Sequence, residues 1–134
     1  MLIAVDGNLG SGKSTVLADL RRRGYTVVPE PVGAWGPMLE RMYADPARWT
    51  LTFQTQVLAH YADVQRRYGT VAGPVFIERS PVSALVFVSL ATHSNALTVD
   101  ELTVYMELHA AIGWEPDATV SPPRRVAASR RRVS

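Results

Sequence analysis

One short segment constrains the fold of this chain more than any other feature. It follows the pattern G-x-x-x-x-G-K-[ST] and consists of Gly7, Asn8, Leu9, Gly10, Ser11, Gly12, Lys13, Ser14 and Thr15. Such a phosphate-binding loop works between a buried strand and a helix. The aliphatic run Leu2–Val5 precedes it, and apolar residues at helical spacing follow it. We therefore predict a strand–loop–helix unit that binds the phosphates of a nucleotide.

The chemistry of this loop requires these residue types at this spacing. Glycines allow successive backbone N–H groups to curl around a phosphate at a helix N-terminus without steric clashes. The ammonium group of Lys13 would contact the β- and γ-phosphates, and the hydroxyl of Ser14 would coordinate Mg²⁺. We therefore expect ATP and Mg²⁺ as ligands.

Strand and helix patterns alternate along the rest of the chain. Short apolar runs predict further strands at 25–28, 75–77 and 117–120. Helical patterns occur around 38–42 after a turn at 33–36, at 47–68 with Asp45 as N-cap, at 81–91, and at 99–113 after a Thr98–Glu101 capping box. This alternation predicts an α/β fold in which helices cover both faces of a parallel sheet, giving three layers.

Composition excludes several classes of protein. The chain has 134 residues and no cysteine, so disulfides and thiolate metal sites are excluded, and its three histidines, His60, His93 and His109, lack metal-ligand spacing. Residues 1–120 carry nine basic and twelve acidic side chains, while 121–134 carry five arginines and no acid. This distribution argues against a nucleic-acid-binding face. No run of 18 apolar residues and no basic leader occur, so we expect no membrane anchor and a cytoplasmic location.

Charged side chains follow two of the predicted strands directly. Glu30 comes after the strand at 25–28, and Glu78 and Arg79 come after the strand at 75–77. The carboxyl ends of parallel strands share one edge of the sheet, where α/β proteins bind ligands. We therefore expect these side chains to face the phosphate loop. A base, a cation and a carboxylate near a metal ion are what phosphoryl transfer requires.

In the order and spacing of its motifs the chain resembles the deoxynucleoside kinase family, which includes the herpesvirus thymidine kinases. The similar stretches lie between Leu2 and about Val120 and comprise the phosphate loop, E-P-V-G-A-W at 30–35, M-Y-A-D-P-A-R-W at 42–49, F-Q-T at 53–55 and E-R-S-P at 78–81. The resemblance implies a P-loop kinase-type fold and ATP-dependent phosphorylation of a deoxynucleoside 5′-hydroxyl in nucleotide salvage. It also implies that a homodimer is possible.

The resemblance assigns roles to individual residues. Glu30 would accept the 5′-hydroxyl proton, although the position of Glu78 is an alternative for this role. Arg79 would hold the same oxygen together with the transferring phosphoryl group, and Glu78 would organise Mg²⁺ with Ser14. Lys13 completes the expected catalytic set.

For the nucleoside, Gln54 matches the residue that pairs with the base and Tyr43 the one that binds the 3′-hydroxyl. The pocket wall would comprise Trp35, Leu39, Phe53, Val57, Tyr61 and Ala84, with Glu30 and Arg79 also contacting substrate. Leu39 and Phe53 could instead be helix core, and Tyr43 a surface residue. The resemblance implies that Tyr61 stacks on the base, as an aromatic at this place stacks on thymine in the herpesvirus thymidine kinases. Tyr61 and Ala84 are neutral where deoxycytidine-type kinases carry charges, which favours thymidine or another pyrimidine. Either Phe87 or Val88 should supply a further pocket residue.

The resemblance ends near residue 120. The family continues with a lid and a fifth strand, so we expect one kinase domain over 1–120 that lacks both. Residues 121–134 would then be a truncated lid region, in which Arg130–Arg132 could start the lid helix, or a solvated basic tail. Such a chain should be weakly active or inactive and prone to aggregate. A nucleoside monophosphate kinase and an inactive nucleotide-binding remnant remain the alternatives.

Overall fold

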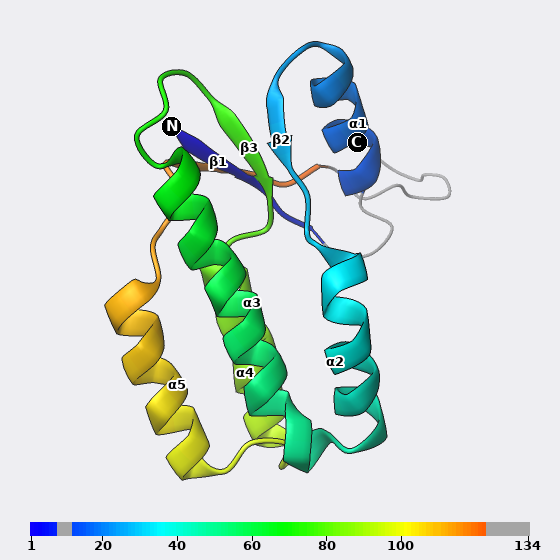
Figure 1. The fold of residues 1–134 in the computed structure, drawn as a ribbon, viewed down its shortest axis with the longest axis vertical. Helices are drawn as coiled ribbons and strands as arrows, with labels where there is room; N and C mark the ends of the chain where they lie inside the picture. The colour runs from blue at the N-terminus through cyan, green and yellow to red at the C-terminus, as the bar shows by residue number, and fades with distance from the viewer. Residues whose placement is uncertain (8–11, 123–134) are drawn as a thin grey trace, which may run out of the picture.

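The computed structural model describes residues 1–7 and 12–122 (Figure 1). Along the chain its elements are β1 (Leu2–Val5), α1 (Lys13–Arg22), β2 (Thr26–Val28), α2 (Val32–Ala44), α3 (Pro46–Tyr68), β3 (Val75–Glu78), α4 (Pro81–His93), α5 (Val99–Ile112) and β4 (Ala118–Val120). Each of the four predicted strands is present to within one residue at either end. The segment that holds Arg130–Arg132 lies outside the described residues.

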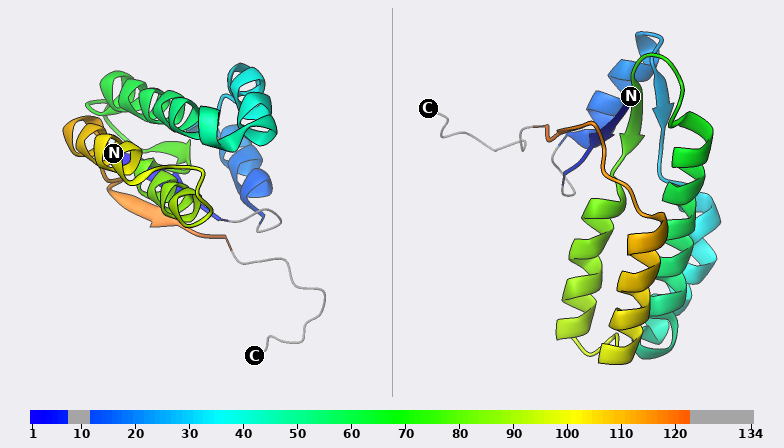
Figure 2. Two further views of the ribbon diagram at one scale, coloured as in Figure 1. Left: turned by 90° about the horizontal axis from the view of Figure 1, so that it is seen from below. Right: turned by 90° about the vertical axis from the view of Figure 1, so that its left-hand side faces the viewer.

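The strands form one parallel sheet in the order β2-β3-β1-β4. Leu2, Ala4, Val75 and Ile77 of the two central strands pack against Val64 of α3 and form the core of the sheet. In the right-hand view of Figure 2, α1 and α3 lie on opposite sides of this sheet. The prediction of a three-layer α/β fold with a parallel sheet is therefore confirmed.

The connections of the two central strands diverge. From β1 the chain passes through α1 to the edge strand β2, whereas from β3 it passes through α4 and α5 to β4 at the opposite edge. A crevice opens where neighbouring strands send their connections in opposite directions, and ligands bind there in open α/β sheets. This point lies between the carboxyl ends of β1 and β3, which lead into Gly7 and Arg79.

Helices α2 to α5 extend beyond this edge of the sheet as a bundle, seen in the lower half of Figure 1. Helix α3 has 23 residues, which corresponds to a length of about 35 Å, and only its C-terminal part packs on the sheet. Its middle contributes Leu58 to a second core with Val88, Leu97 and Tyr105 from α4, α5 and the segment between them. The helices of the bundle therefore surround the space beyond the carboxyl ends of the strands.

Helix α2 corrects the sequence-based expectation for this region. Residues 33–36 are not a turn, because the helix already begins at Val32 and continues through Pro37. Glycine costs roughly 1 kcal/mol in a helix interior, so local propensity opposes this start. Burial outweighs it: Trp35 is 7% exposed and packs edge-on against Phe53 of α3, with ring centroids 5.9 Å apart. The packing of one aromatic side chain thus decides where the helix begins.

Two predicted helix starts were tested by the structure. The Thr98–Glu101 capping box is confirmed: the Glu101 N–H donates to the Thr98 hydroxyl, and the Thr98 N–H donates to the Glu101 carboxylate. Asp45 precedes α3 as expected, but its side chain makes no capping hydrogen bond.

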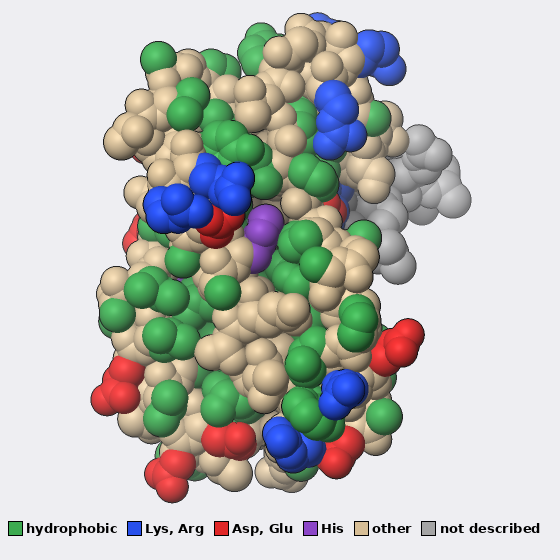
Figure 3. Space-filling model, viewed as in Figure 1, with side chains coloured by type: hydrophobic (Ala, Val, Ile, Leu, Met, Phe, Trp, Pro, Cys, Tyr) green, Lys and Arg blue, Asp and Glu red, His purple; other side chains and the backbone are tan. Residues whose placement is uncertain are grey.

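Charges of both signs are interspersed on the face shown in Figure 3. Arg66 and Arg67 pair with Asp63, and Arg22 and Arg23 pair with Asp19. None of the helices in the described part of the chain has the length and apolar character needed to cross a membrane.

Candidate active site

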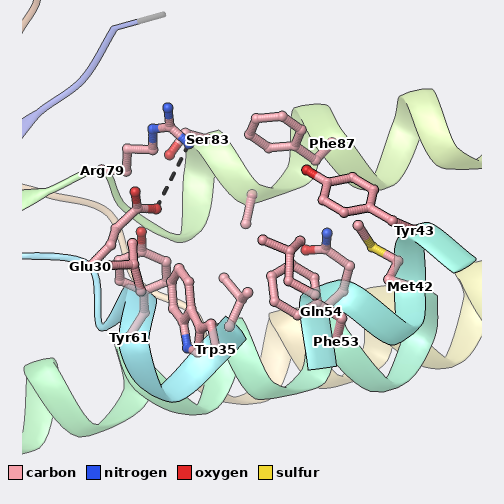
Figure 4. Close-up of a pocket in the computed structure, with 14 residues that line it drawn as sticks. Glu30, Trp35, Met42, Tyr43, Phe53, Gln54, Tyr61, Arg79, Ser83 and Phe87 are labelled. Atoms are coloured by element: carbon pink, nitrogen blue, oxygen red, sulfur yellow. Dashed lines mark ion pairs between the residues drawn. The ribbon is translucent and has the colours of Figure 1, made fainter. Parts of the chain in front are cut away.

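Four side chains that are far apart in the sequence meet at the carboxyl edge of the sheet. The Lys13 ammonium lies 2.7 Å from Oε2 of Glu78 and 4.0 Å from Oε1 of Glu30. Nη1 of Arg79 lies 3.8 Å from Oε2 of Glu30, the pair joined by the dashed line in Figure 4. The structure therefore brings together all four residues that the sequence predicted as catalytic.

The phosphate loop is described at its two ends. Gly12 is the N-cap of α1 with φ of 90°, a left-handed conformation that favours glycine, and Lys13 is the first residue of the helix. Ser14 and Thr15 follow in the exposed first turn. Asn8, Leu9, Gly10 and Ser11, which were predicted to bind nucleotide, lie outside the described residues.

The Glu78–Arg79 junction has an unusual backbone. Arg79 has φ of 64°, which costs a residue other than glycine roughly 1–2 kcal/mol. Strain of this kind concentrates at functional sites, where the surrounding structure holds it in place. Here it turns the chain sharply after β3, so that Glu78 contacts Lys13 while Nη2 of Arg79 reaches the Gly7 carbonyl oxygen, 3.5 Å away.

The two carboxylates differ in their electrostatic environments. Burial raises the pKa of Glu30, opposed by Arg79 and reinforced by the neighbouring Glu78. Burial also acts to raise the pKa of Glu78, but hydrogen bonds from Lys13 and from the Glu30 backbone N–H outweigh it, and the pKa falls below its usual value. Environments that push the pKa values of two neighbouring carboxyl groups apart are typical of sites where one is a base and the other remains ionised.

A cavity of about 250 Å³ adjoins this cluster between α2, α3 and α4 (Figure 4). All ten residues that the sequence predicted to contact substrate line it: Glu30, Trp35, Leu39, Tyr43, Phe53, Gln54, Val57, Tyr61, Arg79 and Ala84. The remaining lining residues are Phe87, which was one of two candidates from the sequence, and Val32, Met42 and Ser83, which were not assigned to the site.

Most of the cavity wall is apolar, and one amide faces into it. Gln54 is only 7% exposed, and Figure 4 shows its amide directed into the cavity. Trp35, Phe53, Val57 and Ala84 belong to one buried cluster around it. An apolar pocket with a single oriented amide can hold a planar, polar ring, because the walls contact the faces and the amide pairs with the edge.

Tyr43 and Phe87 lie at the exposed mouth of the cavity. Tyr43 is 73% exposed and Phe87 is 50% exposed. The choice between Phe87 and Val88 was open from the sequence, and Phe87 lines the cavity while Val88 is buried in the helical core. Helix α4 is apolar around its whole circumference, so its sequence pattern does not indicate which residue faces the cavity.

Tyr61 forms part of the inner wall of the cavity. Its side chain is 1% exposed and its hydroxyl donates to the Glu78 carbonyl oxygen at 3.2 Å. Its ring packs edge-on against His60, which in turn packs against Trp35. Tyr61 thus lies in the floor of the cavity beneath Glu30 (Figure 4).

The residues at the crevice fit a magnesium ion bound together with phosphates. Mg²⁺ in kinase sites usually takes one or two carboxylates and completes its shell with waters and substrate phosphates. Glu30 and Glu78 both face Lys13, which would contact the same phosphates. Among the described residues there is no cluster of three or more acidic or histidine side chains that would form an all-protein metal cage.

Comparison with known proteins agrees with this arrangement. The deoxynucleoside kinase family model matches residues 3–121. A putative deoxynucleoside kinase of Frog virus 3 is 30% identical over 128 residues, covering 92% of this chain and 66% of that protein. The thymidine kinase of Ictalurid herpesvirus 1 is 39% identical over 93 residues, covering 63% of this chain and 39% of that kinase.

The fold is shared with a solved structure of a deoxyadenosine kinase from M. mycoides. The two superpose with a TM-score of 0.79 at 22% sequence identity, over 95% of this chain and 65% of the other. The chain spans two thirds or less of the length of each of these relatives. With a family match over nearly its whole described length, and with Lys13 beside Glu30 at the edge of the cavity, the chain belongs to the deoxynucleoside kinase family.

Proposed function

We propose that this chain is the catalytic part of an enzyme that transfers the γ-phosphoryl group of ATP to the 5′-hydroxyl of a deoxynucleoside in nucleotide salvage. One observation carries the proposal. The cavity that would hold the nucleoside opens at Glu30, and Glu30 lies 4.0 Å from the Lys13 ammonium of the phosphate loop. A hydroxyl at the inner end of the cavity would therefore face the phosphate that Lys13 holds.

The proton and the phosphoryl group then have defined destinations. Glu30 accepts the 5′-hydroxyl proton as the oxygen attacks the γ-phosphorus, and the bond from phosphorus to the β-γ bridging oxygen breaks to release ADP. The raised pKa of Glu30 suits it to take up a proton. Lys13 and Arg79 stabilise the negative charge on the transferring group, which supplies most of the catalysis in phosphoryl transfer. Glu78 would stay ionised.

Ser14 and Glu78 would hold the magnesium ion. When bound, the ion neutralises charge on the ATP phosphates. Glu78 suits this position because its pKa is lowered, which keeps the carboxylate available at neutral pH.

Thymidine or another pyrimidine is our proposed nucleoside. Gln54 is the one amide that lines the described cavity, and Ala84 provides a small neutral wall that is 5% exposed. A neutral edge-pairing group accepts the donor and acceptor pattern of a pyrimidine without requiring charge. The similar proteins include kinases named for thymidine, deoxycytidine and deoxyadenosine, and a competition assay among the deoxynucleosides tests the choice of base, which a strong preference for deoxyguanosine would contradict.

The cavity favours a nucleoside over a nucleoside monophosphate as the acceptor. Arg79 is the single cationic side chain among the described residues that line it. Arg79 is also engaged with Glu30, at 3.8 Å. The phosphate of a nucleoside monophosphate at the inner end of the cavity would therefore lie near the carboxylates of Glu30 and Glu78 and find little free positive charge to bind.

A coupled assay of ADP release tests the proposal. Because the chain spans only part of its relatives, we expect slow turnover with thymidine or deoxycytidine and ATP, none with the corresponding monophosphates, and a further loss of about 10²- to 10⁴-fold in Glu30→Gln. Glu107→Gln on α5, an exposed glutamate outside the site, is the matched control and should keep wild-type turnover. Preferred turnover of a monophosphate, or ATP binding without any turnover, would refute the proposal.

A further inference from the structure

Tyr61 is held at both ends beneath the active site. Its hydroxyl donates to the Glu78 carbonyl oxygen at 3.2 Å, and its own carbonyl oxygen accepts from the Trp114 indole N–H at 2.7 Å. The side chain is 1% exposed and belongs to the buried cluster under the cavity. A tyrosine with its hydroxyl tied to the backbone in this way has little freedom to move with a ligand.

The bond from Tyr61 reaches the peptide group that joins Glu78 to Arg79. The carbonyl of this peptide accepts from Tyr61, and its N–H donates to the Val5 carbonyl oxygen at 3.0 Å. One peptide plane is therefore fixed from two sides, by α3 and by β1.

The two side chains at the end of β3, Glu78 and Arg79, depend on the orientation of this plane. Glu78 lies immediately before it and reaches Lys13, and Arg79 lies immediately after it and reaches Glu30. Arg79 also has the left-handed φ of 64°, which a residue other than glycine keeps only if its surroundings hold it. Loss of one of the two hydrogen bonds would allow the plane to rotate and would misdirect both side chains.

We propose that Tyr61 is a positioning residue for phosphoryl transfer, whose hydroxyl fixes the Glu78–Arg79 peptide and so aims both side chains at the reacting phosphate. The inference rests on the proposed function for its catalytic consequence. It differs from the base-stacking role that the sequence suggested, because it predicts an effect on the chemical step rather than on nucleoside binding.

Kinetics of Tyr61→Phe separate the two roles. The change removes one oxygen and keeps the ring, so we expect kcat to fall about tenfold or more while the KM for the nucleoside stays within about twofold. The control is Tyr105→Phe, because Tyr105 is also fully buried but its hydroxyl has no hydrogen-bond partner in the described structure. It should leave both constants unchanged. A raised KM with unchanged kcat, or kinetics equal to those of the control, would overturn the proposal.

Amide hydrogen exchange of Arg79, measured by NMR, provides a second readout that requires no turnover. In Tyr61→Phe we expect the Arg79 N–H, which donates to Val5, to exchange about fivefold faster than in wild type, with no such change in Tyr105→Phe. Equal exchange of this amide in the two variants would contradict the positioning role. Because this measurement is independent of activity, it decides the role of Tyr61 even if the chain phosphorylates no nucleoside.

Discussion

Neutralising each of the two active-site carboxylates in turn should have opposite consequences for stability. Glu78 accepts hydrogen bonds from the Lys13 ammonium at 2.7 Å and from the Glu30 N–H at 3.0 Å, with only 17% of its side chain exposed. Hydrogen bonds to charged groups contribute about 1.5–3 kcal/mol each. The amide in Glu78→Gln retains an acceptor for the backbone N–H but loses the charge that pairs with Lys13. We therefore expect a loss of about 2 kcal/mol at pH 7, or roughly 6–10 °C in Tm for a domain of this size.

Glu30→Gln should cost much less. The raised pKa of Glu30 shows that burial and the nearby Glu78 outweigh the attraction of Arg79 and Lys13 for its charge. At neutral pH the ionised side chain therefore opposes folding, and its replacement by a neutral amide of the same shape should leave Tm unchanged or raise it slightly. Polar groups that serve catalysis often carry such a stability cost.

The dependence on pH has opposite signs for the two groups. The pKa of Glu78 is lowered from 4.5, so its stabilising contribution is present above pH 4.5 and disappears as the pH falls through the folded-state pKa. The pKa of Glu30 is raised from 4.5, so its favourable contribution is complete below pH 4.5 and disappears as the pH rises through the folded-state pKa. On acidification the Tm deficit of Glu78→Gln relative to wild type should therefore shrink, whereas the Tm of Glu30→Gln should fall relative to that of wild type.

Thermal unfolding followed by circular dichroism between pH 3.5 and 7.5 measures both effects, with Glu107→Gln as the surface control. The range spans the ordinary value of 4.5 for both groups. The assignment of roles would be refuted if Glu30→Gln lowered Tm at pH 7 as much as Glu78→Gln, or if the deficit of Glu78→Gln grew in acid.

Three further substitutions test the cavity mouth, the helical core and the cap of α5. Phe87→Ala should weaken nucleoside binding measured by calorimetry and barely change Tm, because Phe87 is half exposed at the cavity mouth. Val88→Ala should instead lower the free energy of unfolding by about 2 kcal/mol and leave binding intact, because Val88 is only 1% exposed. The reverse pattern would show that Val88 faces the ligand. Thr98→Ala removes one half of the capping box of α5 and should cost about 1 kcal/mol in urea unfolding; no change in the midpoint would mean that the cap does not stabilise the helix.

Several features of this protein follow from local sequence and needed no tertiary information. The phosphate loop depends on glycines, a lysine and a hydroxyl within nine consecutive residues, so its chemistry is determined locally. The capping box before α5 closes within four residues. The meeting of Glu30 with Glu78 and Arg79 could also be predicted, because parallel strands end at one edge of the sheet whatever their order.

Tertiary packing decided the rest. Helix α2 begins at Val32 against the propensity of its glycines because burial of Trp35 against α3 outweighs their cost. Phe87 rather than Val88 reaches the cavity because the neighbours of α4 determine which face is covered, while its sequence places apolar residues on every side. Tyr61 lines the pocket as predicted, but no local pattern indicates that its hydroxyl donates to the Glu78 carbonyl oxygen, 17 residues away along the chain. A local pattern determines the chemical groups that are available, whereas burial and the hydrogen bonds of a distant strand decide where each one points.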